Sequence, residues 1–148
     1  MRWLWFCLLS GWLLVGCGGS ERAVVSERDE GVVAEATEAM DKGELVYLTY
    51  CAECHGVNLE GEANWQERNE DGSFRAPPHD ETGHTWHHPD SYLEESILLG
   101  GERIDSSLGV SKMPAYEGVL SEEEVAAVID YIKRQWSDDI RAMQAARN

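Results

Sequence analysis

Two cysteines three positions apart, followed at once by a histidine, form the run Cys51-Ala52-Glu53-Cys54-His55. Thiols at this spacing can reach the two vinyl groups on one edge of a porphyrin and form thioethers, and the next residue then falls under the iron. The run therefore predicts one covalently bound haem c, held by Cys51 and Cys54, with His55 as an axial ligand of the iron. A chain that wraps a macrocycle can also contain long irregular loops, because the loops pack against the macrocycle as part of the core.

Other uses of a C-x-x-C pair fit this sequence less well. A zinc ribbon needs a second pair of ligands, and no cysteine follows Cys54. A thioredoxin-like redox pair accompanies a βαβ pattern, which this sequence does not show.

The N-terminus has the pattern of an exported and lipidated protein. Residues 1–16 are typical of a signal peptide, with Arg2 ahead of an apolar run that is shorter than the roughly 20 residues of a spanning helix. The run ends in Leu14-Val15-Gly16-Cys17, which resembles the lipobox of bacterial lipoproteins. Lipidation of Cys17 would anchor the protein to a membrane, outside the cytoplasm, in the periplasm or on the outer face of the cytoplasmic membrane. Ordinary cleavage that leaves Cys17 as a free thiol is the alternative, and residues 17–34 are expected to form a flexible tether.

A haem domain is expected over residues 35–137, and its first helix over residues 35–50 would lead directly into the haem-attachment run. The predicted buried face of this helix holds Ala39, Gly43, Tyr47 and Tyr50, with Met40, Leu45 and Leu48 beside it.

Two further helices follow a long loop at residues 56–88 that lacks any periodicity. A short helix is expected to begin with Pro89 at its first helical position and to close at Gly100-Gly101. The last helix begins with a capping box, formed by Ser121 and Glu124. Its predicted buried stripe holds Val125, Val128, Ile129, Ile132 and Trp136. The C-terminal tail, residues 138–148, fits either helix or frayed chain.

A second axial ligand is expected because haem iron in electron carriers usually has two protein ligands. Met113 is the favoured candidate, since Pro114 stiffens its loop and the other methionines lie in the signal, ahead of the haem run or in the polar tail. Met113 could instead be a gap-filling core residue, or a histidine could take the distal position.

Four histidines occur within ten residues, at His79, His84, His87 and His88. They fit a polar loop over the haem edge, in which His84, Trp86, His87 and His88 could contact the haem propionates. They also fit a secondary copper or zinc site, because imidazole with a carboxylate suits those metals. Trp86 needs a partner for its indole N–H if it is buried, and a propionate is one candidate.

With these residues in view, the chain resembles a class I cytochrome c, and more narrowly the small bacterial monohaem c-type cytochrome lipoproteins. The resemblance covers residues 38–136 and is carried by Gly43-x-x-x-Tyr47, Cys51-x-x-Cys54-His55-Gly56, Met113-Pro114 and the last helix with Tyr131-Ile132. It implies an all-α fold in which the N- and C-terminal helices cross, with Gly43 facing Tyr131, and long loops wrap one haem. The segment 64–88 is longer and richer in histidine than the minimal fold requires, so the resemblance assigns it no role.

The resemblance and the ligand set imply an electron carrier rather than an enzyme, since two protein ligands leave the iron no open position for a substrate. Peroxide reduction at the haem would require Met113 to dissociate. The alternative is a haem subunit, or a haem domain partner, of a dehydrogenase or a terminal reductase.

The formal net charge of −16 excludes a basic nucleic-acid-binding surface. Removal of residues 1–16 takes away only one charged side chain, Arg2, and leaves the protein near −17. Such acidity would steer it toward redox partner proteins with a basic docking face, in small and transient complexes. It could equally serve only to keep an exported protein soluble.

Overall fold

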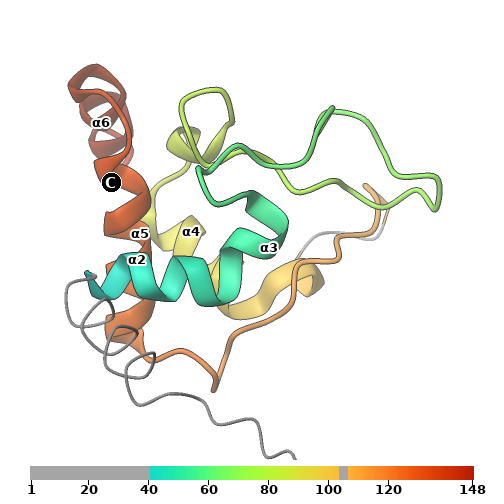
Figure 1. Ribbon diagram of the computed structural model, residues 1–148, viewed down its shortest axis with the longest axis horizontal. Helices are drawn as coiled ribbons and strands as arrows, with labels where there is room; N and C mark the ends of the chain where they lie inside the picture. Colours follow the sequence, from blue (N-terminus) through green and yellow to red (C-terminus); the bar gives the residue numbers. More distant parts are fainter. Residues whose placement is uncertain (1–40, 104–106) are drawn as a thin grey trace, which may run out of the picture.

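The computed structural model describes residues 41–103 and 107–148 (Figure 1). The predicted signal peptide, lipidation site at Cys17, tether over residues 17–34 and first helical residues 35–40 lie outside the described residues.

The described residues form an all-α fold, as predicted. Their helical elements are, in chain order, α2 (Lys42–Val46), η1 (Tyr47–Cys51), α3 (Ala52–His55), η2 (Thr85–His87), α4 (Asp90–Leu99), η3 (Gly100–Arg103), α5 (Glu122–Arg134) and α6 (Asp138–Ala145). Within the described ranges, β pairing is limited to isolated bridges, Arg68–Phe74 and Ser73–Val110, and no strand forms.

The elements α2, η1 and α3 make one continuous helix that carries the haem-attachment run at its C-terminal end (Figure 1). Asp41 is its N-cap, since Oδ1 accepts hydrogen bonds from the backbone N–H groups of Gly43, at 2.8 Å, and Glu44, at 3.4 Å. The middle turn, η1, is a π-helix. The helix stops at Gly56, whose φ of 79° is a conformation that glycine adopts without steric cost. The prediction that the helix leads into the run is confirmed, but this helix begins at Lys42 rather than at residue 35, because Asp41 has an extended backbone and caps it.

The buried face of this helix differs in part from the predicted one. Gly43 and Tyr47 are buried as expected, but Tyr50 is 39% exposed and Val46 is buried instead. A π-helical turn holds more residues than an α-helical turn, and η1 therefore rotates later positions away from the 3.6-residue register on which the prediction rested.

The haem helix crosses α5 at Gly43, as the resemblance implied. A Cβ atom on Gly43 would overlap the carbonyl of Ala127 and would lie 2.8 Å from Cβ of Tyr131. The absence of a side chain therefore lets the two backbones approach closely. The ring of Tyr47 packs beside this crossing, with its centroid 5.4 Å from that of Tyr131.

Helix α5 begins and packs as predicted. Ser121 is its N-cap, and both hydrogen bonds of the capping box with Glu124 are present. All five residues of the predicted stripe are buried, namely Val125, Val128, Ile129, Ile132 and Trp136.

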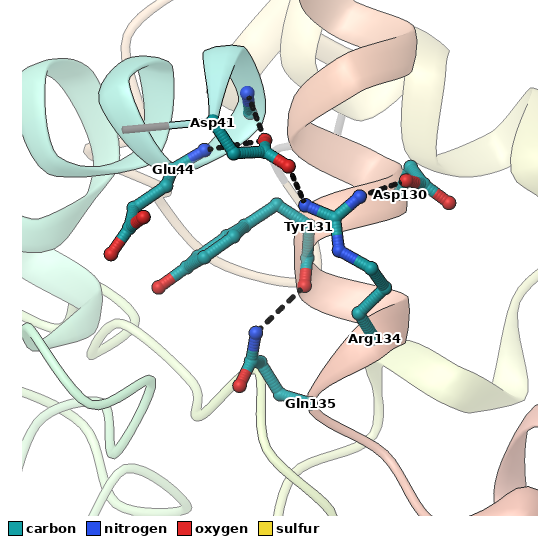
Figure 2. Close-up of polar contacts among 7 residues, drawn as sticks. Asp41, Glu44, Asp130, Tyr131, Arg134 and Gln135 are labelled. Atoms are coloured by element: carbon teal, nitrogen blue, oxygen red, sulfur yellow. Dashed lines mark hydrogen bonds and ion pairs between the residues drawn. The ribbon is translucent and has the colours of Figure 1, made fainter. Parts of the chain in front are cut away.

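The last turn of α5 also holds the start of the haem helix (Figure 2). Arg134 pairs with Asp41 at 2.5 Å and with Asp130 on its own helix. Asp41 thus caps α2 through one carboxylate oxygen and binds α5 through the other.

Helix α4 begins one residue later than predicted, because Pro89 is its N-cap rather than its first helical residue. It ends at Gly100, as expected. The C-terminal tail is helical, and α6 packs beside η2 and the start of α4. There the amide of Gln144 donates to the carbonyl of His88, at 3.2 Å, and to the carboxylate of Asp90, at 2.7 Å.

The segment 56–88 is irregular apart from the short η2, in agreement with the predicted loop. In Figure 1 this green loop and the orange segment that contains Met113 lie on either side of α3. Across the described ranges, no helix combines the length and the apolar character that crossing a membrane requires.

Candidate haem site

The two thiols and the imidazole of the haem-attachment run are brought together by one helical segment. Cys51 ends η1, while Cys54 and His55 lie on α3. Neither sulfur is in a disulfide, and Cys54 is exposed while Cys51 is half-buried. Both thiols are therefore available for thioether bonds along one side of this helix.

His55 is buried and oriented by a backbone carbonyl. Its Nδ1 lies 2.8 Å from the carbonyl oxygen of Pro77, which can only accept a hydrogen bond, so Nδ1 carries the proton. Burial lowers the pKa of His55 below its ordinary value, although the hydrogen bond to Pro77 opposes this shift. The imidazole is thus neutral near pH 7, and its Nε2 lone pair is available to a metal.

The environment of Cys51 argues against a dithiol redox function. Burial, followed by the charge of Cys54, raises the pKa of Cys51 to about 11. Redox-active C-x-x-C pairs depend on a lowered thiol pKa, because the thiolate is the nucleophile. The Cys51 thiol instead stays protonated near neutral pH.

The turn that brings Pro77 to His55 depends on Gly61. This residue has a φ of 67°, and a Cβ atom there would lie 2.5 Å from the nitrogen of Pro78 and 2.7 Å from the carbonyl carbon of Pro77. The Gly61 N–H also donates to the carbonyl of His55, at 2.8 Å. A larger residue at position 61 would therefore displace the carbonyl that orients the imidazole.

Tyr47 supports the haem-attachment run through hydrogen bonds to its C-terminal end. Its ring is fully buried, and its hydroxyl donates to the carbonyls of Gly56, at 2.9 Å, and His55, at 3.3 Å. Burial raises the pKa of Tyr47, so its phenol remains a donor. These bonds satisfy carbonyls at the end of α3 that have no partner within the helix.

Met113 lies in the segment between η3 and α5, half-buried, and its loop is tied to the haem helix. The carbonyl of Met113 accepts from the N–H of Gly101 at 2.8 Å. Three residues further on, the hydroxyl of Tyr116 donates to the carbonyl of Tyr50 at 2.6 Å, directly before the first haem cysteine. The segments that carry the two predicted axial ligands, His55 and Met113, are thus connected by a hydrogen bond.

The long segment that the resemblance left without a role braces this methionine loop. Arg68 donates to the carbonyl of Leu108 at 2.7 Å, and its guanidinium lies 3.5 Å from the ring centroid of Phe74. The N–H of Phe74 donates to the carbonyl of Val110 at 2.8 Å. An ion pair of 2.6 Å between Asp71 and Lys112 adds a third tie. We call these contacts between residues 68–74 and 108–112 the loop brace.

The predicted histidine cluster separates into groups. His87 stacks on Trp86 at 3.6 Å between ring centroids, and the indole N–H of Trp86 donates to the carbonyl of Glu81 at 3.3 Å. The chain itself therefore supplies a partner for the indole N–H, for which a propionate was one candidate. Nδ1 of His84 lies 3.3 Å from Nε2 of His88. In the described ranges, no group of three or more His, Cys, Asp or Glu residues is arranged to hold a metal ion.

His79 takes a position that sequence reasoning missed. Its ring stacks on that of His55, with the centroids 4.0 Å apart and the planes 22° from parallel. If Nε2 of His55 held a haem iron, the stacked ring of His79 would lie on the same side of that haem, so His79 is excluded as the ligand opposite His55. Burial, and then the neighbouring imidazoles of His55 and His84, lower the pKa of His79 well below its ordinary value. Its place next to Pro77-Pro78 in the sequence was the one signal that could have pointed to it.

The residues present fit haem c. Two free thiols and a neutral imidazole with an available Nε2 occupy one helical segment, and a half-buried methionine lies in a connected loop. The all-α fold with its crossing terminal helices and this donor set define a class I c-type cytochrome domain.

The chain belongs to a family of such cytochromes. Residues 38–132 match the family model described as "Cytochrome C oxidase, cbb3-type, subunit III", and this match covers more than half of the chain. No curated protein and no solved structure matches significantly. The family implies haem c binding and a haem-based role in electron transfer, and its cytochrome c domains are typically extracytoplasmic.

Proposed function

We propose that this protein is a monohaem electron carrier, tethered outside the cytoplasmic membrane through lipidated Cys17. One haem c is attached through Cys51 and Cys54, and His55 and Met113 are its axial ligands. The single observation that carries the proposal is the 2.8 Å contact between Nδ1 of His55 and the Pro77 carbonyl, which leaves Nε2 available beside two free thiols.

Haem c, when bound, supplies a one-electron couple. The residues of this chain hold and orient that group: Cys51 and Cys54 fix one edge, and Pro77 directs Nε2 of His55. The ties between Met113 and Gly101 and between Tyr116 and Tyr50 restrain the methionine loop. Two fixed protein ligands leave no position for a substrate, which favours electron transfer over catalysis.

Optical and electron paramagnetic resonance spectra of the oxidised protein test this assignment. The parent protein is expected to be low-spin with a nitrogen and a sulfur ligand, and Met113→Ala should lose that signature. Met143→Ala is the matched control, because Met143 is 45% exposed on α6, and its spectra should equal those of the parent. A colourless protein, or a Met113→Ala variant with the parent spectra, would contradict the proposal.

Covalent attachment and the anchor need separate measurements. After denaturation, the parent should keep its haem on the chain, whereas Cys51→Ala combined with Cys54→Ala should release it. Mass spectrometry of the mature protein should find acyl chains on the cysteine at position 17, and a Cys17→Ser variant should leave the membrane fraction. Release of haem from the denatured parent, or an unmodified Cys17, would refute the respective part.

One alternative is a haem subunit of a larger terminal reductase. The family match favours this alternative, because the description of the matching family refers to an oxidase subunit. Purification in mild detergent separates the two roles. A subunit would copurify in a stable complex of fixed stoichiometry, whereas the proposed carrier elutes alone.

A second candidate function, transition-metal binding, is favoured by the pair His84 and His88. Two nitrogens on one tetrahedral zinc ion, each at about 2.0–2.1 Å, lie roughly 3.3–3.4 Å apart. The two imidazole nitrogens are 3.3 Å apart and share a hydrogen bond, which a bound ion would replace. Burial, followed by neighbouring imidazoles, lowers the pKa of both histidines, so both are neutral ligands near pH 7. Calorimetric titration with Cu²⁺ or Zn²⁺ should show one site that is lost in His84→Ala and His88→Ala. It should be kept in His87→Ala, and a parent that binds neither ion would exclude this candidate.

A further inference from the structure

A second imidazole lies flat against the imidazole of the proposed haem ligand. The ring centroids of His79 and His55 are 4.0 Å apart, and their planes are 22° from parallel. The two residues are 24 positions apart in the sequence, and the turn through Pro77-Pro78 brings them together.

His79 is itself held in one orientation by its side chain. Nδ1 lies 2.8 Å from Oγ1 of Thr85, and that hydroxyl donates to the carbonyl of Pro78 at 3.4 Å. A hydroxyl can donate to or accept from an imidazole nitrogen, so this hydrogen bond forms with either tautomer of His79. The plane of the His79 ring is therefore tied to η2, where Thr85 is buried.

The backbone of His79 is fixed as well. Its N–H donates to the carbonyl of Leu59 at 2.8 Å. Its carbonyl accepts from the indole N–H of Trp136, also at 2.8 Å. Trp136 belongs to the buried core, so His79 is anchored to the rigid centre of the protein rather than to a surface loop.

The hydrogen bond from His55 to Pro77 leaves one motion open. A histidine ring has a broad χ2 preference, and a ring that donates through a single nitrogen can still turn about the line of that hydrogen bond. A flat ring fixed 4.0 Å from its face blocks this rotation, because turning would drive the edge of one ring into the face of the other.

We propose that His79 is a positioning residue that fixes the plane of the His55 imidazole and so sets the orientation of the axial ligand about the iron–nitrogen axis. This inference rests on the proposed function, in which His55 ligates the iron. A histidine suits the task because it combines a flat face with a ring nitrogen that hydrogen-bonds to Thr85, whereas an aliphatic residue has neither.

The proton resonances of the haem methyl groups in the oxidised protein provide the test, because their spread depends on the orientation of the axial imidazole plane. His79→Leu should retain both axial ligands. It should change the spread of the haem methyl resonances and the principal g-values of the electron paramagnetic resonance spectrum. His79→Phe keeps a flat ring and should remain closer to the parent than His79→Leu. Thr85→Val keeps the size of the side chain but removes its hydrogen bonds to His79 and to the Pro78 carbonyl, and it should give a smaller change in the same direction.

Met143→Ala is the control, since Met143 is 45% exposed on α6 and has no role assigned at the haem. Its haem methyl resonances should match those of the parent. If His79→Leu and Thr85→Val both give the parent spectrum, the inference is overturned while the proposed function stands. If His79→Leu does not retain haem, Thr85→Val decides: a shifted spectrum supports the inference and an unshifted one refutes it. If the parent itself lacks a low-spin spectrum with two protein ligands, the proposed function fails.

Discussion

At the crossing of the haem helix and α5, a single residue without a side chain determines how closely the two backbones approach. Gly43 faces the Ala127 carbonyl, and backbone atoms cannot turn aside as a flexible side chain can. The position of the haem-attachment run relative to the core therefore depends on a residue eight positions before Cys51.

Gly43→Ala is expected to destabilise the protein despite the higher helix propensity of alanine. Overpacking typically costs about 1–3 kcal/mol, and the gain in propensity offsets at most about 1 kcal/mol of it. Denaturant unfolding of the haem-loaded protein should show the lower free energy of unfolding. Lys42→Ala, at the preceding exposed position, loses only a surface ion pair with Glu123 and should unfold like the parent. An equally stable Gly43→Ala variant would show that the crossing can relax.

At the scale of elements, the extra length of the segment 64–88 acquires a physical role through the loop brace. Without it, the methionine loop would be held by its ties to Gly101 and Tyr50 and by backbone hydrogen bonds to the end of α4. The brace adds Arg68, the backbone of Phe74 and the ion pair of Asp71 with Lys112 on another side. An insertion that looks like a surface loop in the sequence thus restrains the loop that carries the proposed distal ligand.

Arg68→Ala is therefore expected to speed the replacement of Met113 by an added ligand such as imidazole. A hydrogen bond contributes about 0.5–1.5 kcal/mol. If this whole contribution holds the methionine loop in place, its loss makes the replacement of Met113 roughly 2- to 13-fold faster. Stopped-flow spectroscopy of the oxidised protein measures this rate. Arg75→Ala is the control, because Arg75 donates to the carbonyl of Ala63 and belongs to no contact of the brace. Equal rates in parent and Arg68→Ala would remove the role assigned to the brace.

The capping box of α5 gives an acid-dependent contribution to stability. The N–H and hydroxyl of Ser121 hold the pKa of Glu124 below its ordinary value. A carboxylate with a lowered folded-state pKa contributes stability that is complete above the unfolded value of about 4.3 and is lost as pH falls through the folded value. Unfolding measured from pH 7 to pH 3 should show Glu124→Gln less stable than the parent at pH 7, with the difference narrowing in acid. A difference for Glu124→Gln that stays constant from pH 7 to pH 3 would contradict the assignment.

At the scale of the whole molecule, the sequence predicted those structural features that depend on residues close together along the chain. The capping box at Ser121 and the apolar stripe of α5 were readable, because each depends on spacing along one helix. The glycine at the crossing was predicted through the resemblance to class I cytochromes c. The helical state of the tail was left open, since its polar residues carry little periodicity.

The remaining features depend on contacts between distant segments that carry no periodicity. The π-helical turn in η1 shifted Tyr50 out of the core, and propensity gave no sign of it. His79 looked like one of four loop histidines, and only the folded path of Pro77-Pro78 places it on His55. The loop brace joins two irregular segments about 40 positions apart, so no local pattern could reveal it.

The charge of the whole molecule makes a final prediction about its encounters. A formal net charge of −16 creates a field that attracts cationic partners, and dissolved salt screens it over a Debye length of about 10 Å at 0.1 M. Electron transfer from the reduced protein to a cationic acceptor protein should therefore slow as ionic strength rises from 0.01 to 0.5 M, roughly tenfold or more. Transfer to an acidic acceptor of similar potential should accelerate over the same range, and transfer to a small neutral acceptor should stay constant. All three acceptors react with the same protein. A salt-dependent change in haem ligation would therefore change all three rates in the same direction. Rates that do not depend on salt for any acceptor would mean that the acidity serves solubility rather than steering.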